Sequence, residues 1–355
     1  MKKDLHTTNE LLAEALARAA ESWQDPDFPP RAQAVKQTLE APNRFTEEAV
    51  TFAVNQQMNL LTPERLGTWI GCRFAERPRT VGVLNAGNIP LVGLQDFLAV
   101  VCTGHRYLGS ISSKSPYLLP AFVTEVRRNE PELCASFATA DEIFDAAEAV
   151  IATGSDETKT WVEAQCEQHS IPSERCLLRG HRYGVAVVDG KETEDEWERL
   201  AEDALLHEGL GCRNVALIWA PEGLPPDAFL QSMAAFRAVF PPHKDTAGAL
   251  RMQQAFLEAL DLPHAYGDGL EFLLSKGEAD VQGPGHVRWV EYTDLNEVAA
   301  WLVEHAREHQ LVVARTEVAR RLPPTLSTEL PGEAQRPALD WCPEGTDTVA
   351  FLSSL

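Results

Sequence analysis

Between Thr80 and Arg315, short runs of β-branched and apolar residues alternate with longer stretches of helical periodicity. In the first half of this region, strands are predicted over TVGVL (80–84), RYLGSIS (106–112) and AEAVIAT (147–153). A predicted helix follows each strand, from about Ile89, after Pro116 and from Asp156. Such alternation is typical of βαβ units, whose parallel sheet is covered by helices on both faces. The chain is therefore predicted to have an α/β fold.

A second block of alternation predicts a second α/β domain. It begins with the strand GVAVVDG (184–190) and a long acidic helix from Thr193 to His207, in which Thr193 and Glu196 have the spacing of a capping box. The predicted order then continues with strand 215–220, helices 226–239 and 244–260, strand 286–292, helix 294–309 and strand 311–315. We place the boundary between the two domains near Gly180 to Gly184.

The two ends of the chain differ from this alternating region. The N-terminal part has helical periodicity, and Thr62 followed by Pro63 is a typical helix start. Residues 322–337 are rich in Pro and polar side chains, which predicts an irregular crossing. The predicted organisation is a helical segment (1–79), two α/β domains (80–182 and 183–330) and a C-terminal segment (331–355).

The charge of the chain excludes two classes of partner. Its 355 residues carry 53 acidic side chains against 31 Lys and Arg, a formal net charge of −22. A surface this acidic repels phosphate backbones and anionic lipid headgroups, so we expect no nucleic-acid binding and no binding to a membrane surface. Arg outnumbers Lys among the cations, and together with the acidic excess this suggests adaptation to high salt.

The sequence also predicts a cytoplasmic location. No apolar stretch follows the two lysines of the N-terminus, so no secretory signal is expected. The most apolar stretch is interrupted by Gln95 and Asp96 and is too short to cross a membrane. The seven cysteines are odd in number and include no CxxC pair, which favours a reducing compartment without structural disulfides or a cysteine-based zinc site.

Cys212 is the first candidate for chemistry. It lies in HEGLGCRNVALIWA, between the predicted acidic helix and a buried strand, and Gly209 and Gly211 before it would let a substrate approach the backbone. A cation favours the nucleophilic thiolate, and Arg213 follows directly. The alternative is a small buried cysteine of the core, the commoner situation for a cysteine chosen at random.

Two asparagines follow the first predicted strand, in VGVLNAGNIP. Amides there lie at the carboxyl edge of a parallel sheet, where α/β proteins bind ligands. Asn88 is placed to donate its amide N–H to a developing oxyanion. The alternative is that Asn88 caps the helix expected from Ile89, and for Asn85 and Asn88 as a pair both functions are compatible.

Thr153, Gly154 and Ser155 link the third predicted strand to its helix. Backbone N–H groups at a helix N-terminus attract anions, so this turn is a candidate pyrophosphate site. It lacks the GxGxxG pattern, and the alternative is that Ser155 or Asp156 caps the helix.

Four segments together resemble one family in order and spacing: NAGNIP, ISSKSP, ATGSDET and GLGCRNV. They are similar to the acyl-CoA reductase family typified by the fatty-acid reductase of bacterial luminescence (LuxC-like), a branch of the aldehyde dehydrogenase superfamily. The resemblance covers residues 78–300, and the closing DTVAFLSSL is also similar. It implies an aldehyde dehydrogenase-like fold, with a Rossmann-type cofactor domain, an α/β catalytic domain, and an active site between them.

The resemblance implies roles for individual residues. Cys212 matches the family nucleophile, which takes the acyl group as a thioester, and Asn88 matches the oxyanion-stabilising Asn. The resemblance implies NADPH or NADH as the cofactor, contacted by the Thr153–Ser155 turn. The further candidate cofactor-binding residues are Asn85, Ser112, Ser113 and Lys114. Among these, Lys114 and Ser112 or Ser113 are the candidates to hold a 2′-phosphate.

The chain also departs from the superfamily pattern. Leu178, in LLRGHRYG, stands where hydrolytic aldehyde dehydrogenases have a water-activating Glu, and losing that base suits a reductase because water would discharge the acyl-enzyme to the acid. Ser110 replaces a cofactor-binding Lys, and the ribose-binding Glu has no counterpart in QGPGHVRWVEY.

Two further motifs have ordinary structural interpretations. His305 to His309 fits the H-x-x-E-H metallopeptidase pattern, with both histidines expected on one helix face, but a third ligand is missing and no metal is predicted. His207 and Glu208 precede Cys212 and are candidates for an acid or a base, although we interpret them as the exposed end of a charged helix.

The leading prediction is an NAD(P)H-dependent reductase of acyl-CoA that forms an acyl thioester on Cys212 and releases an aldehyde. Two alternatives remain: an acyltransferase or acyl carrier that uses Cys212 without a redox step, and a non-catalytic relative that works with a partner. The resemblance suggests an acyl-protein synthetase or an acyltransferase as that partner, and we also expect a homo-oligomer.

Overall fold

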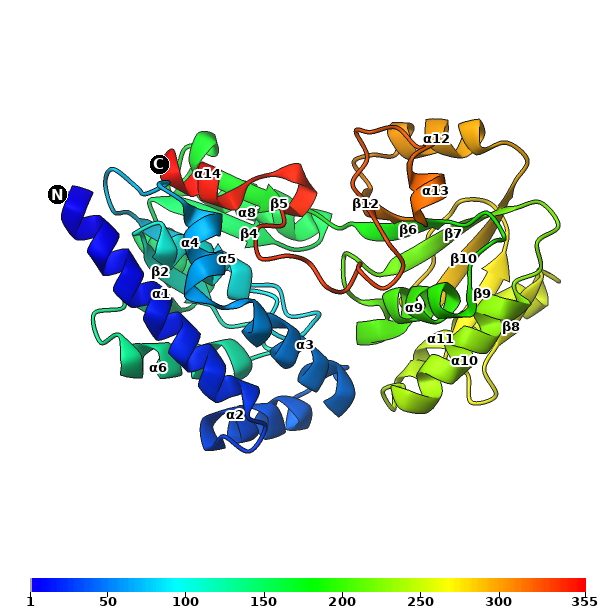
Figure 1. Ribbon diagram of the computed structural model, residues 1–355, viewed down its shortest axis with the longest axis horizontal. Coiled ribbons are helices and arrows are strands. Elements are labelled where there is room, and N and C mark those ends of the chain that lie inside the picture. Colours follow the sequence, from blue (N-terminus) through cyan, green and yellow to red (C-terminus); the bar gives the residue numbers. More distant parts are fainter. Residues whose placement is uncertain (1) are drawn as a thin grey trace. The chain divides into compact units, whose positions relative to one another are not determined.

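The computed structural model describes residues 2–355, with side chains from Glu10 onward, and the chain forms two compact units (Figure 1). The first unit combines three stretches of the chain: residues 1–43, 50–181 and 338–355. The second contains residues 182–337 together with the short segment 44–49. Each unit is built around one sheet, and the C-terminal residues belong to the first unit although they follow the second in sequence.

The sheet of the first unit has five parallel strands in the order β3-β2-β1-β4-β5. In chain order these strands and the helices between them are β1 (Thr80–Leu84), α5 (Leu94–Cys102), β2 (Arg106–Ser110), α6 (Leu118–Asn129), β3 (Ala135–Ala138), α7 (Ala140–Ala146), β4 (Ala149–Thr153), α8 (Asp156–Gln168) and β5 (Cys176–Arg179). The predicted parallel α/β arrangement is confirmed, and two strands and one helix (β3, α7 and β5) were not predicted from the sequence.

Helices cover both faces of this sheet. On one face Phe97 of α5 packs edge-on against Tyr107 of β2, with ring centroids 5.2 Å apart. On the other face Gly82 leaves room for Ile143 of α7, whose methyl carbon lies 2.5 Å from where a Cβ would be, and α8 packs on β4 through a shared apolar cluster. Because α5 and α8 follow neighbouring strands but cover opposite faces, the carboxyl ends of β1 and β4 form a topological switch point.

Four N-terminal helices precede the first sheet: α1 (Lys2–Gln24), α2 (Pro29–Glu40), α3 (Glu47–Leu60) and α4 (Pro63–Ile70). They belong to the first unit except for the first three residues of α3, which are part of the segment 44–49. The predicted cap is present, since the Thr62 side chain accepts a hydrogen bond from the backbone N–H of Arg65. Both α1 and α2 pack against α6, and Trp23 meets Phe122 edge-on at 5.3 Å. Helical periodicity in this segment therefore reflects one apolar face per helix buried against the α/β core.

A buried ion pair connects three elements of the first unit. Arg179 at the end of β5 donates from Nη1 to both carboxylate oxygens of Asp96 in α5, each at 2.9 Å. Its Nη2 donates to the hydroxyl of Thr348 in α14 (Thr348–Ser353) at 2.7 Å. The closing segment DTVAFLSSL is thus a helix anchored to the sheet.

The sheet of the second unit has seven strands in the order β12-β11-β6-β7-β10-β9-β8, parallel except for β8 against β9. The strands are β6 (Tyr183–Val187), β7 (Val215–Pro221), β8 (His264–Tyr266), β9 (Leu273–Lys276), β10 (His286–Tyr292), β11 (His309–Val313) and β12 (Thr328–Glu329). The helices are α9 (Glu194–Leu205), α10 (Asp227–Val239), α11 (Thr246–Ala259), α12 (Leu295–Glu304) and α13 (Thr316–Ala319).

Two apolar layers sandwich this sheet. One packs α9 and α10 against β6, β7 and β10 around Trp197, Phe229 and Trp289, and the other packs α12 and α13 on the opposite face. The predicted capping box is present at the start of α9, where Thr193 and Glu196 bond reciprocally. Alternate residues of β6 enter the two layers, as a strand buried on both faces requires.

Two predicted helix boundaries are wrong. Helix α5 begins at Leu94 with Gly93 as its N-cap, so Asn88 does not cap it. Helix α12 ends at Glu304, and His309 is the first residue of β11 instead of lying on the same helix face as His305. The His305 ring hydrogen-bonds the Trp301 carbonyl and the His309 ring hydrogen-bonds the Leu302 carbonyl, each at 2.9 Å. The H-x-x-E-H spacing therefore has no metal-binding geometry.

No helix among residues 2–355 is long and apolar enough to cross a membrane.

Candidate functional site

In the first unit, the candidate residues gather at the carboxyl ends of three adjacent strands. Asn85 and Asn88 follow β1, and Ser112 to Lys114 follow β2. Thr153 is the last residue of β4, and Gly154 and Ser155 follow it. Since β2, β1 and β4 are neighbours in a parallel sheet, these loops share one edge. This is the edge at which open α/β sheets bind ligands.

Asn85 connects the ends of β1 and β2. Its side-chain Nδ2 donates to the Tyr107 hydroxyl and to the Ser110 carbonyl, each at 2.8 Å, and its backbone N–H donates to the Ser110 hydroxyl at 2.9 Å. Its Oδ1 is buried, and Gly93 is required beside it because a Cβ there would lie 2.1 Å from that oxygen. Both donors of the amide are thus engaged in holding the two loops together.

Asn88 lies half-buried in the loop between β1 and α5. Three residues later Leu91 has a φ of 55° although its side chain is buried. The left-handed region costs a residue with a Cβ about 1 to 2 kcal/mol, and such strained backbone occurs mostly at functional sites. The loop between β1 and α5 thus contains one buried residue with strained backbone, three positions after Asn88.

The turn after β4 is a helix N-terminus, as predicted. Ser155 is the N-cap of α8, and its Oγ accepts a hydrogen bond from the Thr158 backbone N–H at 3.3 Å. Gly154 is required by a close approach, since a Cβ there would meet the Thr158 side chain at 2.8 Å. The capping role proposed as the alternative for Ser155 is confirmed, and the helix start still presents backbone N–H groups to an anion.

Ser112, Ser113 and Lys114 lie in the loop after β2. Lys114 and Ser113 are exposed, and the Lys114 carbonyl accepts a hydrogen bond from Asn43 at 3.1 Å. Ser112 packs against Gly87, where a Cβ would lie 1.9 Å from the Ser112 hydroxyl oxygen. The loops after β1 and β2 are thus in direct contact, and the exposed Lys114 carries an ammonium group at this sheet edge.

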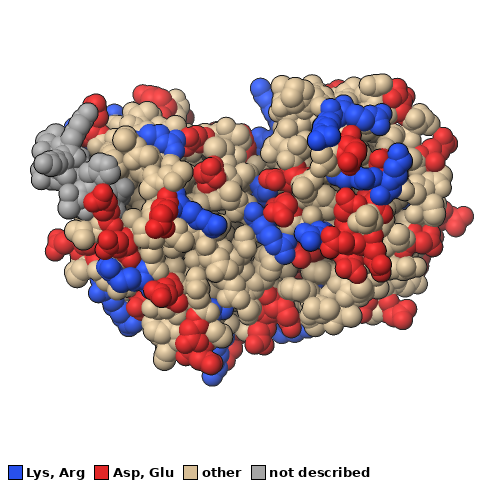
Figure 2. All heavy atoms as spheres, viewed as in Figure 1, with Lys and Arg blue, Asp and Glu red and all other residues tan. Residues whose placement is uncertain are grey.

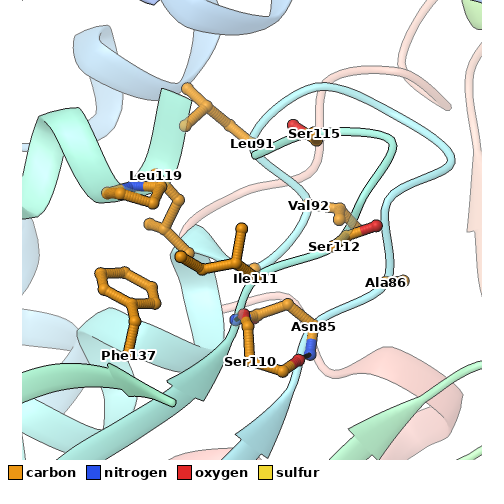
Figure 3. A pocket seen from close by; sticks show the side chains of 12 residues that line it. Asn85, Ala86, Leu91, Val92, Ser110, Ile111, Ser112, Ser115, Leu119 and Phe137 are labelled. Atoms are coloured by element: carbon orange, nitrogen blue, oxygen red, sulfur yellow. Dashed lines mark hydrogen bonds between the residues drawn. The ribbon is translucent and has the colours of Figure 1, made fainter. Parts of the chain in front are cut away.

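A small cavity of about 20 Å³, with room for about one water molecule, lies between these two loops. Figure 3 shows Asn85 and Ser110 close together at its base, with Ile111, Leu119 and Phe137 forming an apolar side. Ser112 and Ser115 line the pocket from the loop after β2.

In the second unit, Cys212 lies at the tip of a tight turn between α9 and β7. The backbone N–H of Asn214 donates to the Gly211 carbonyl at 3.0 Å, which makes Cys212 the second residue of a four-residue turn. Cys212 is half-buried, while Gly211, Arg213 and Asn214 are buried. Within this turn Cys212 is the one residue that is not fully buried, which argues against the alternative of a core cysteine.

Asn214 is a residue that the sequence analysis missed. Its Oδ1 accepts the Gly211 backbone N–H at 2.8 Å, and its Nδ2 donates to three carbonyls at the end of α9, those of Asp203, Ala204 and Leu206, at 2.8 to 3.3 Å. Asn214 is 2% exposed. It therefore bonds the end of α9 and closes the Cys212 turn with one side chain. The sequence signal available for it was the presence of Gly and Asn, which both favour turns.

Arg213 directs its guanidinium into the unit. Its Nε donates to the Ala334 carbonyl, and its Nη2 forms an ion pair with Glu329 at 3.1 Å. Burial lowers the pKa of Arg213, whereas Glu329 and the charge of Cys212 raise it. The Arg213 charge thus interacts favourably with the Cys212 sulfur while being paired mainly with Glu329.

The interpretation of His207 and Glu208 as an exposed helix end is wrong. Both are buried, and burial lowers the pKa of His207 to about 4, so the imidazole is neutral at pH 7. Helix α9 ends at Leu205, and the three residues from His207 to Gly209 have φ values of 56°, 58° and 70°.

Gly209 leaves space for the protein's own backbone and not for a substrate, since a Cβ there would lie 2.7 Å from the Gly285 nitrogen.

The candidate residues thus form two groups, one in each unit. In the first are Asn85, Asn88, Ser112, Ser113, Lys114, Thr153, Gly154 and Ser155, and in the second is Cys212. Acidic side chains are spread over the face drawn in Figure 2, with Lys and Arg interspersed. Among residues whose side chains are described, three or more His, Cys, Asp or Glu nowhere form a cluster suited to a metal ion.

Comparison with known families and proteins identifies a relative for part of the chain. Residues 73–235 match the model of the family "Acyl-CoA reductase (LuxC)", which confirms the predicted resemblance. The matched region contains NAGNIP, the Thr153–Ser155 turn and Cys212. No curated protein sequence matches the chain.

Solved structures with a similar fold are aldehyde dehydrogenase-like enzymes. An oxidoreductase from Marinobacter aquaeolei has a TM-score of 0.73 and 12% identity, over 98% of this chain and 84% of that one. A putative methylmalonate-semialdehyde dehydrogenase from Sinorhizobium meliloti, complexed with NAD, has a TM-score of 0.68 and 11% identity over 93% and 79%. An NAD-dependent benzaldehyde dehydrogenase from Corynebacterium glutamicum has a TM-score of 0.67 and 12% identity over 93% and 83%.

The predicted fold class is therefore confirmed, and the family match and the fold together support an aldehyde-related oxidoreductase.

Proposed function

We propose that this protein reduces acyl-CoA to an aldehyde with NADPH or NADH, through an acyl thioester on Cys212. The observation that carries the proposal is the tip of the Gly211–Asn214 turn, where Cys212 is half-buried while the other three residues of the turn are buried. The LuxC family match includes this turn. A thiol held in this way is suited to nucleophilic catalysis.

In the proposed first step, the Cys212 thiolate attacks the thioester carbonyl carbon, and the CoA thiolate leaves. Asn88 and the Cys212 backbone N–H stabilise the oxyanion that develops on the carbonyl oxygen. A cation beside a thiol favours its thiolate form, and Arg213 directly follows Cys212 in sequence. The product of this step is an acyl group bonded to Cys212.

Residues of the first unit are suited to hold a nicotinamide dinucleotide. The start of α8, capped by Ser155 and preceded by Gly154, presents backbone N–H groups to a pyrophosphate. Lys114 and Ser113 are exposed at the same sheet edge and suit the 2′-phosphate that distinguishes NADPH from NADH. When bound, the reduced cofactor supplies the hydride that turns the acyl thioester into a hemithioacetal, which then releases the aldehyde.

The surroundings of Leu178 support reduction over hydrolysis. Leu178 lies within β5 and packs against the apolar cluster between α8 and β4, rather than in the turn expected from the sequence. An apolar side chain cannot activate water, so nothing at this position promotes discharge of the acyl group to the acid.

The test is an assay of nucleotide oxidation with acyl-CoA substrates of several chain lengths. We expect absorbance at 340 nm to fall with NADPH, NADH or both, and Cys212→Ala to abolish this. Cys72→Ala is the matched control, because Cys72 is an exposed cysteine outside the candidate site and its loss should leave the rate unchanged. Absence of oxidation with both nucleotides at every chain length contradicts the proposal.

A second candidate function is acyl transfer from Cys212 without reduction. It is favoured by Ser110, which stands in place of a cofactor-binding Lys. The Ser110 hydroxyl oxygen accepts a hydrogen bond from the Asn85 backbone N–H. Acylation of Cys212 without measurable nucleotide binding would support this function. If neither acylation nor nucleotide binding occurs, the remaining candidate is a non-catalytic protein that works with an acyl-protein synthetase or acyltransferase.

A further inference from the structure

A buried carboxylate lies four residues before Cys212. The Glu208 side chain is 3% exposed, and its Oε1 accepts a hydrogen bond from Arg237 Nη1 at 2.9 Å. Its Oε2 accepts a hydrogen bond from the Thr246 hydroxyl. Arg237 belongs to α10 and Thr246 is the first residue of α11, so Glu208 connects its own turn to two helices of the second unit.

The backbone around Glu208 needs this anchoring. His207 and Glu208 are consecutive residues with left-handed φ, a conformation that side chains with a Cβ rarely adopt, and Gly209 continues it. The Leu210 N–H donates to the His207 carbonyl at 3.0 Å and closes this turn. The Cys212 turn begins at the next residue, so the direction in which Gly211 to Asn214 leave α9 depends on the first turn.

The anchor also extends to a distant part of the sequence. The Thr246 hydroxyl, which donates to Glu208, accepts a hydrogen bond from Arg44 Nη2 at 3.1 Å. Arg44 begins the short segment 44–49 that belongs to the second unit. Arg44 and Arg237 repel each other, and Glu208 attracts Arg237. Glu208, together with Glu271, thus supplies negative charge to Arg237, the guanidinium group that Arg44 repels.

We propose that Glu208 is a positioning residue for the Cys212 thiol. Its carboxylate, bonded to Arg237 and Thr246, holds the left-handed turn in the one geometry that presents Cys212 half-buried at the tip of the following turn. Its relevance to catalysis rests on the proposed function, because that function makes Cys212 the nucleophile. Both carboxylate oxygens are engaged within the protein, so Glu208 acts through the backbone and not by proton transfer.

The test measures the accessibility of Cys212 without any substrate. Wild-type protein, Glu208→Gln and the control Glu198→Gln, an exposed carboxylate on α9, are alkylated with iodoacetamide, and the rate at each cysteine is followed by peptide mass mapping. We expect Glu208→Gln to raise the alkylation rate of Cys212 at least fivefold, because the turn loosens. The exposed Cys72 serves as an internal reference whose rate stays constant.

Two further variants separate positioning from general stability. Thr246→Val removes one bond to Glu208 and keeps every charge, so it should raise the Cys212 rate in the same direction even if Glu208→Gln folds poorly. The double variant Glu208→Gln with Arg237→Gln removes both charges and should restore part of the protection. A residue important only for stability would lower the unfolding midpoint in urea and leave Cys212 alkylation unchanged in the folded protein.

The proposal is overturned if Glu208→Gln and Thr246→Val both leave the Cys212 alkylation rate within twofold of wild type. This readout needs neither acyl-CoA nor nucleotide, so it remains decisive if the proposed reductase activity fails. If that activity holds, the same variants should lower kcat at least tenfold with KM for acyl-CoA changed less than threefold.

Discussion

The side-chain Oδ1 of Asn214 accepts the backbone N–H of Gly211 at 2.8 Å, and this bond closes the turn that presents Cys212. The Nδ2 of the same side chain donates to carbonyls at the end of α9. The point where the helix stops and the point where the candidate nucleophile appears are thus set by one buried amide. This coupling explains why a strongly polar residue lies next to the first residue of the buried strand β7.

Replacing Asn214 should therefore lower the stability of the fold. Asn214→Ala leaves buried carbonyls of α9 and the Gly211 N–H without their partner, and we expect a loss of about 3 kcal/mol in the free energy of unfolding, since each orphaned buried group costs about 1 to 3 kcal/mol. Urea unfolding measures this loss. Asn296→Ala, at an exposed asparagine, should change the same quantity by less than about 0.5 kcal/mol.

The Asp96–Arg179 pair predicts a large effect in the first unit. Asp96→Ala leaves the guanidinium of Arg179, 5% exposed, without its carboxylate, and breaking a buried pair in this way costs about 3 to 5 kcal/mol. Asp195→Ala removes an ion pair to Arg199 in which both side chains are more than half exposed, and should cost less than about 1 kcal/mol. Equal effects of the two substitutions on the unfolding midpoint would contradict this account of the pair.

Asp203 predicts how stability depends on pH. Burial raises the pKa of this carboxyl to about 7, and the Gly332 N–H bonded to it only partly opposes the shift. The folded state therefore holds a proton that the unfolded state loses as pH rises from about 4, so the free energy of unfolding should fall between pH 4 and pH 7 by on the order of 4 kcal/mol.

Asp203→Asn isolates this effect. The amide accepts the same hydrogen bond from Gly332 and carries no charge, so the variant should be more stable than wild type at pH 8 and similar to it at pH 4. Denaturant midpoints at the two pH values measure the difference. A variant less stable than wild type at pH 8 would show that the carboxylate form is the stabilising one.

The net charge of −22 predicts a dependence on salt. Repulsion among the acidic side chains is screened as ionic strength rises, since the Debye length falls to about 3 Å at 1 M. We expect the urea midpoint to rise steadily from 0.1 M to 2 M NaCl without loss of activity, with sucrose of equal osmolality as the control. An optimum of stability and activity at low ionic strength would count against adaptation to high salt.

The alternating pattern predicted most of the fold because buried parallel strands and amphipathic helices have distinct periodicities. Strand HVRWVEY was predicted over the residues that form β10, and the Thr193–Glu196 capping box marked the start of α9. The strand β5 and the helix α7 were missed because both are short: β5 (Cys176–Arg179) has four residues and α7 (Ala140–Ala146) has seven. Their formation depends on pairing with β4 and packing against Gly82, which are contacts between distant residues.

The candidate site was predicted residue by residue but not as a set of interactions. Glycines and asparagines beside Cys212 marked a turn, whereas the burial of Glu208 depends on Arg237 and Thr246, which are 29 and 38 residues away in sequence. Charged side chains at a helix end are usually exposed, so the sequence favoured that interpretation for His207 and Glu208. Only the tertiary structure shows that α9 stops early and that the next turn enters the core.

The most direct test of the proposed function is to trap the acyl group on Cys212. The protein is mixed with a long-chain acyl-CoA in the absence of nucleotide, and intact mass and peptide mapping locate the acyl group before and after NADPH or NADH is added. We predict one acyl group per chain, on Cys212 alone, sensitive to hydroxylamine, absent in Cys212→Ala and released as aldehyde when nucleotide is added. An unmodified Cys212, or an acyl group that stays on the protein in the presence of both nucleotides, would contradict it.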